Sequence, residues 1–220
     1  VQESAVQNLW LLTAGTNLYI HLTDFSAQTF EERILLFQDK SYIANRVVII
    51  THCILVIIST WGMGLLLSHQ AKGFSQLGIL SFTVFGLTEI SRMVFSLTYV
   101  NGLREKYFGE TNLQARQFLE YSLNNAGLVN NIFFRIFITA FAFGLLFYSI
   151  ALLNRNSKSD IILGITFLVL SVITFLALVN EFEGNNTISK LVYWSSITLQ
   201  PLLRVWMGVW IFKNFNKQTQ

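Results

Sequence analysis

The chain has 220 residues, of which 53% are hydrophobic and only 12% are charged. Soluble domains carry about 25% charged residues, so this composition excludes a soluble globule and indicates an integral membrane protein. Proline and cysteine occur once each, which excludes collagen-like, disordered and disulfide-stapled chains. The net charge is +3 without a basic stripe that could neutralise a phosphate backbone, so we expect no nucleic-acid partner.

Charge-free apolar segments of about 20 residues mark the expected membrane crossings, because each must span ~30 Å of hydrocarbon. Five segments meet this criterion clearly, and a sixth, nearest the start, contains several polar side chains. We interpret the sixth as a span, since it lacks the basic leader and cleavage site of a signal peptide; five spans is the alternative. The sequence predicts one all-α domain over 1–220, a polytopic transmembrane helical bundle with spans at 4–23, 47–67, 74–98, 132–153, 161–179 and 191–212.

Lysine and arginine set the expected orientation, because short cytoplasmic loops are enriched in these residues. With six spans, both termini share one side with the short basic connections 68–73 and 154–160. The long connections 24–46 and 99–131 lie on the opposite side, together with most of the acidic residues. We therefore expect a multi-pass protein of the cell membrane with both termini in the cytoplasm.

The first long connection contains a helix-start pattern. Thr29 and Glu32 have the spacing of a capping box, and Phe30, Ile34 and Phe37 follow at helical spacing. A short helix lying on the membrane surface would explain this pattern. A helix packed across the mouth of the bundle would explain it equally well.

Four ionisable residues fall inside the predicted spans: Glu89, Arg92, Arg135 and Arg204. Each costs at least ~2.5 kcal/mol near the bilayer centre, so we expect these side chains to face the bundle interior and find partners. Glu89 and Arg135 both fall in the outer half of the membrane by their rise along the helices. We expect them to form an ion pair, with Arg92 assisting from the same helix face as Glu89.

Arg204 lies deeper, about one turn after Pro201, the only proline. This proline removes a backbone bond to the carbonyl of Ile197 and is expected to bend the helix. One interpretation is a polar, anion-accepting cavity opened by the bent helix, and the other is a buried ion-pair cluster that fixes helix registry. The candidate ligand-binding residues are Glu89, Arg92, Arg135, Gln200 and Arg204.

The histidines offer a weaker alternative. His21 and His52 both lie near the predicted outer face, where two imidazoles could ligate a haem or a metal. No carboxylate is spaced to orient them, so we expect neither a cofactor nor a metal. Cys53 follows His52 directly, and neighbours in a helix point about 100° apart, which disfavours a Cys–His nucleophile. No catalytic motif is present, and we expect a protein that is not an enzyme.

Several sequence elements together resemble a family. They are Gly15 and Tyr19 in the first span, Asn45-Arg46 before the second, Gly127 before the Phe-rich fourth, and Val-Trp-Met-Gly-Val-Trp-Ile-Phe-Lys at 205–213. This layout resembles a large bacterial family of six-helix membrane proteins of about this length, described only as a domain of unknown function. The proline-rich features usual near its fifth and sixth spans are mostly absent here. The resemblance implies a fold and a bacterial inner membrane, without a reaction.

Three functional hypotheses follow from these patterns. The first is a membrane protein, embedded in the lipid bilayer, that binds or moves a small anionic or amphiphilic ligand in a polar cavity. The second is a structural or accessory subunit whose buried ion pairs hold helices within a complex of membrane subunits. The third is a haem- or metal-binding membrane protein or an intramembrane enzyme.

Overall fold

The structure, a computed structural model, describes residues 2–23, 25, 27, 29–155, 157–184 and 186–218. In this part of the chain every regular element is helical, which confirms the predicted all-α class. Three irregular helical segments interrupt the α-helices: Leu36–Gln38 is 3₁₀, and Ser96–Val100 and Ser195–Leu199 are π-helical. The α-helices are α1 Gln2–Leu22, α2 Phe30–Leu35, α3 Lys40–Ser68, α4 Lys72–Phe95, α5 Asn101–Gly109, α6 Leu113–Leu153, α7 Lys158–Glu183, α8 Asn186–Trp194 and α9 Gln200–Gln218.

Four helices of the described chain are long and apolar enough to cross a membrane. They are α3, the continuous run of α4 and α5 over Lys72–Gly109, α6, and α7 as far as Asn180. These helices contain the predicted spans 47–67, 74–98, 132–153 and 161–179, and they make the chain compatible with a multi-pass membrane protein. The predicted spans 4–23 and 191–212 fall in α1 and in α8–α9. These helices are not among the four candidate spans, so their crossing of the membrane stays a prediction.

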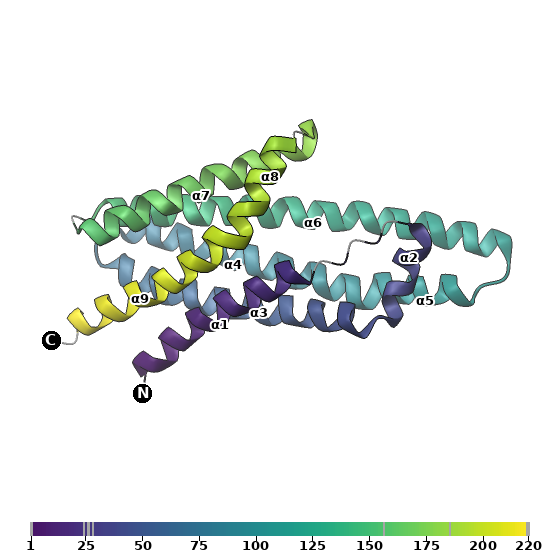
Figure 1. The fold of residues 1–220 in the computed structure, drawn as a ribbon, viewed down its shortest axis with the longest axis horizontal. Helices are drawn as coiled ribbons and strands as arrows, with labels where there is room; N and C mark the ends of the chain where they lie inside the picture. The colour runs from purple at the N-terminus through teal and green to yellow at the C-terminus, as the bar shows by residue number, and fades with distance from the viewer. Residues whose placement is uncertain are drawn as a thin grey trace.

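The long helices run back and forth along one direction (Figure 1). The beginning of α1 and the end of α9 lie at the same end of the bundle, together with the α3–α4 and α6–α7 connections. We call this the terminal end. The opposite end carries α2 and the connection between α5 and α6.

α5 and the beginning of α6 extend well beyond the other helices (Figure 1). α6 has 41 residues, which gives a length of roughly 60 Å, about twice the thickness of a hydrocarbon core. We call this extension, residues 101–131, the stalk. α2 lies across it, with the Phe30 ring 5.3 Å from that of Tyr107 on α5.

The predicted capping box forms at the start of α2. Glu32 donates its backbone N–H to Thr29 Oγ1, and the Thr29 N–H reaches Glu32 Oε2. Ile34 is only 5% exposed, because α2 packs against α5. Of the two expected arrangements, the structure therefore has the helix across the mouth of the bundle.

The helices pack closely in the half of the bundle near the terminal end. A Cβ added at Gly78 would collide with the ring of Tyr148, and one added at Gly86 would lie 2.5 Å from Ile57 Cδ1. Tyr148 donates its hydroxyl to the Thr60 carbonyl at 2.6 Å, which joins α6 to α3. Small residues and hydroxyl bonds of this kind replace the hydrophobic driving force that is missing between helices in lipid.

The outward faces of these helices are apolar. Leu65, Leu80, Leu87, Ile162 and Val172 are each more than half exposed. A soluble protein would rarely expose so many large aliphatic side chains on its long helices. The pattern is expected for side chains that face lipid.

Pro201 has the local effect that its chemistry predicts. Its nitrogen cannot donate to the carbonyl of Ile197, and the helix widens into the π segment Ser195–Leu199 directly before it. The second π segment, Ser96–Val100, joins α4 to α5 without a proline. This second π segment was not predicted from the sequence.

Candidate functional site

A cavity of about 560 Å³ lies in the middle of the bundle. We call it the central cavity. All the long helices contribute to its wall, α1 and α8–α9 included. Part of the wall is polar and comprises Asn17, Arg46, His52, Glu89, Arg92 and Arg204, and another part is apolar and comprises Phe134, Phe137, Ile138, Phe141, Ile173 and Val192.

The structure brings four of the five predicted ligand-binding residues to this cavity. Glu89, Arg92, Gln200 and Arg204 all contribute to its wall. Arg135 does not: its side chain is exposed. Its neighbour Phe134 occupies the cavity-facing position of α6, and consecutive helical residues point about 100° apart.

Glu89 forms its ion pair with Arg92. Its two carboxylate oxygens accept hydrogen bonds from Nε and Nη2 of Arg92, both at 2.6 Å. The predicted Glu89–Arg135 pair is therefore wrong. Arg92 lies about one turn along the same helix and fills both oxygens, whereas Arg135 is turned away from the cavity.

Arg204 is the deepest cation of the central cavity. It is 6% exposed, and within the described part of the chain its guanidinium has neither a hydrogen bond nor an ion pair. Glu89, the one carboxylate among the described lining residues, is already occupied by Arg92. A buried cation without a partner costs several kcal/mol, so this position calls for an anion or water in the cavity.

Two further polar atoms at the cavity wall have no partner. Asn17 Oδ1 and Arg46 Nε are buried and accept or donate no hydrogen bond. An unsatisfied buried polar atom costs about 1–3 kcal/mol, which a ligand or water can offset. The sequence analysis did not select either residue. The i, i+4 spacing of Asn17 and His21 on α1 was the signal that could have indicated this polar face.

The two histidines also lie on the central cavity. Nδ1 of His52 is 2.7 Å from Thr16 Oγ1, which joins α3 to α1. Among the described residues, no group of three or more His, Cys, Asp or Glu side chains is placed to hold a metal ion. The described residues therefore give no support to the haem or metal hypothesis.

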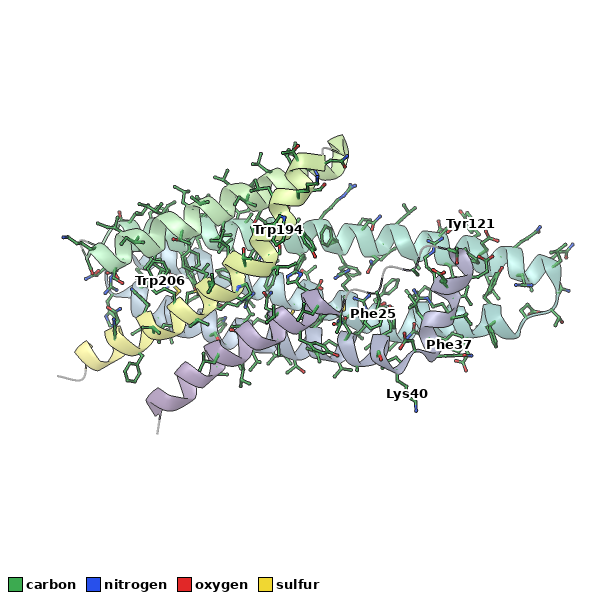
Figure 2. The ribbon with its side chains drawn as sticks, in the orientation of Figure 1. Phe25, Phe37, Lys40, Tyr121, Trp194 and Trp206 are labelled. Carbon is green, nitrogen blue, oxygen red and sulfur yellow. The ribbon has the colours of Figure 1, made fainter. Side chains whose placement is uncertain are left out.

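The central cavity is closed toward the terminal end. Met63, Leu67, Leu152 and Leu163 are fully buried there and belong to one continuous hydrophobic core. In the opposite direction, the cavity shares Phe25, Arg46 and Arg92 with a second cavity beneath α2. Figure 2 shows Phe25 beside the last turn of α1, where the two cavities meet.

Comparison with known proteins gave no relative: no protein-family model, curated protein or solved structure matches the chain. The resemblance to the bacterial six-helix family stays a prediction.

Proposed function

We propose that the protein binds a small amphiphilic anion in the central cavity, with Arg204 contacting the anionic group. The observation that carries this proposal is the burial of Arg204 without a hydrogen bond or ion pair in the described chain. An anion at this position would remove the cost of an uncompensated buried charge. Asn17, whose Oδ1 lacks a partner, can meet a hydroxyl or amide of the same ligand.

The apolar wall supports an amphiphile over a purely polar anion. Phe137 stacks on Phe85 with ring centroids 4.8 Å apart, and Phe141 lies 5.0 Å from the same ring. These rings form a surface suited to an alkyl or ring system. The cavity volume of about 560 Å³ falls within the usual range of about 300–1,000 Å³ for small-molecule sites.

Our proposal places the protein in the bacterial inner membrane with six crossings and both termini in the cytoplasm. Two observations support counting α1 and α8–α9 as crossings: both line the central cavity, and α1 packs along α9. Six crossings also agree with the common end shared by the beginning of α1 and the end of α9. Short basic connections at that end support the cytoplasmic side.

Labelling of single cysteines tests this topology. In a Cys53→Ala background, Lys40→Cys should react with an impermeant maleimide on intact cells, since Lys40 is exposed at the stalk end (Figure 2). Lys213→Cys and Glu3→Cys should react only after the membrane is permeabilised. Reaction of Lys213→Cys on intact cells would reverse the orientation, and reaction of Glu3→Cys alone would reduce the spans to five.

The binding proposal is tested with a photoreactive dodecanoate in phosphatidylcholine nanodiscs, with photoreactive dodecanol as the uncharged control. Dodecanoate should label α6 peptides that contain Phe137 and Phe141, and dodecanol should label them weakly. A charge-assisted hydrogen bond contributes about 1.5–3 kcal/mol, so Arg204→Met should reduce dodecanoate labelling about tenfold or more. Arg135→Met is the matched control, because Arg135 lies on α6 outside the cavity wall.

Two results would overturn the proposal. One is equal labelling by dodecanoate and dodecanol, and the other is unchanged dodecanoate labelling of Arg204→Met. Either result would favour the alternative of an accessory subunit. Within the central cavity that alternative has weaker support, because the Glu89–Arg92 pair lies within α4 and joins no two helices.

A further inference from the structure

The second cavity, about 370 Å³ in volume, lies beneath α2 at the stalk end. We call it the outer vestibule. Four arginines line it: Arg33, Arg46, Arg92 and Arg104. Among its described lining residues there is no aspartate or glutamate. Arg92 is neutralised by Glu89 below, so three guanidiniums of the described lining have no carboxylate partner.

Tyr42 holds two of these arginines together. The Cζ atom of Arg46 lies 4.6 Å from the centroid of the Tyr42 ring, and that of Arg104 lies 5.4 Å from it. Arg104 Nη1 also donates to the Tyr42 hydroxyl at 3.3 Å and to Asn101 Oδ1 at 2.9 Å. Tyr42 is itself fixed, being 2% exposed and 2.9 Å from Ser96 Oγ.

Both guanidiniums keep donors for a ligand. The hydrogen bond of Arg46 goes to Met93 Sδ, a weak acceptor, at 3.8 Å, and its buried Nε has no partner. Arg104 bonds only neutral oxygens. Two like charges held against one ring repel each other, and an anion close to both would offset this repulsion. The arrangement is therefore built for a charge that the described residues do not supply.

We propose that the outer vestibule binds a phosphate group through Arg46 and Arg104. The planar guanidinium matches the oxygens of phosphate in geometry, and two positive charges suit a dianion better than a single carboxylate. Asn124 and Asn130 of α6 line the same space and can bond the remaining oxygens or the group attached to them. Arg46 borders both cavities, whereas Tyr42 and Arg104 line only the vestibule, so Arg104 distinguishes this site from that of the proposed function.

Two sources can supply such a group, a soluble phosphate or the headgroup of a lipid. The protein in phosphatidylcholine nanodiscs is titrated by calorimetry with inorganic phosphate in one arm. In the other arm, nanodiscs that also contain phosphatidic acid are analysed by native mass spectrometry for lipid retained on the protein. Binding in the first arm identifies a soluble ligand, and selective retention in the second identifies a lipid headgroup.

In whichever arm shows binding, Arg104→Gln should weaken it about tenfold or more, since it removes one charged hydrogen-bonding partner. Tyr42→Phe keeps the aromatic ring but loses the hydroxyl that positions Arg104, and should weaken binding less. Arg116→Gln is the matched control, because the Cζ atom of Arg116 also lies over a tyrosine ring, 4.6 Å from the Tyr107 centroid, but Arg116 is outside the vestibule wall. Its binding should equal that of the parent protein.

The proposal is overturned by absence of binding in both arms, or by equal losses in Arg104→Gln and Arg116→Gln. The test is also separable from that of the central cavity. Arg204→Met should keep phosphate binding while losing dodecanoate labelling, and Arg104→Gln should show the reverse. A folded Arg104→Gln protein is verified by its retained dodecanoate labelling.

Discussion

Among the described residues, arginine is paired with a carboxylate at the terminal end of the molecule and with neutral groups at the stalk end. At the terminal end, Arg155 donates from Nε to Asp160 Oδ2 at 2.7 Å and from Nη2 to Asn214 Oδ1 at 3.1 Å. The other oxygen of Asp160 accepts from Trp210 Nε1 at 2.5 Å. At the stalk end, Arg46 and Arg104 lie against the ring of Tyr42, but no carboxylate reaches them in the described chain.

The difference separates two uses of one side chain. Arg155 is neutralised, and its bonds tie the α6–α7 connection to α9. Such a cluster holds helices in place and leaves no charge for a ligand. Arg46, Arg104 and Arg204 keep their charge and face cavities. The presence or absence of a carboxylate, more than burial, distinguishes the structural arginines from the candidate binding residues.

The largest expected effect is at the terminal end. Asp160→Ala would leave the Trp210 N–H and the Arg155 guanidinium without their carboxylate, at a cost of about 3–5 kcal/mol. The melting temperature in detergent should fall steeply. Asp39→Ala, which removes only the side chain that caps α3, should cost about 1 kcal/mol and serves as the control. Equal losses in the two variants would mean that the cluster at Asp160 contributes no more than a helix cap.

An intermediate effect is expected at the Glu89–Arg92 pair, which lies between the two ends. Glu89→Gln leaves Arg92 without its partner, but the Arg92 side chain is 17% exposed at a cavity and water can reach it. We expect a loss at the lower end of the range for broken buried pairs, about 3 kcal/mol. Adding Arg92→Gln should partly restore the melting temperature. Additive losses in the double variant would show that the two side chains act independently.

The smallest effect is expected at Arg204. Arg204→Met removes a buried charge that has no protein partner to lose, so stability should be unchanged or slightly raised. Thermal melting of the variant in ligand-free detergent measures this directly. A fall as large as that of Asp160→Ala would contradict the comparison and place Arg204 among the structural arginines.

Local features were predictable from the sequence. The capping box at Thr29 and Glu32 depends on residues three apart, and the structure contains it. The placement of Glu89, Arg92, Gln200 and Arg204 at the interior follows from the high cost of charged and polar groups in lipid. The capping box depends on the spacing of residues within one helix, and the interior placement depends on the cost of charged and polar groups in lipid. Neither prediction required knowledge of the neighbouring helices.

Features that depend on the rotation of one helix against another were not predictable. The pairing of Glu89 with Arg135 was argued from depth alone, and depth does not say which way α6 turns Arg135. The outer vestibule was missed because Tyr42 and Arg104 are 62 residues apart and meet only when α3 and α5 pack. The π segment Ser96–Val100 contributes Ser96 and Val100 to the wall of the outer vestibule. The segment contains no proline that would have indicated it in the sequence.

α6 runs without interruption from Leu113 to Leu153 and carries parts of both cavities on one rod. Asn124 and Asn130 border the outer vestibule, Phe137 and Phe141 border the central cavity, and Tyr148 is locked in the packed half. Because α6 is one uninterrupted helix, a ligand that displaced it at the vestibule would also displace the aromatic wall of the central cavity. If such a displacement occurs, thermodynamic reciprocity requires that each ligand change the affinity for the other by the same factor.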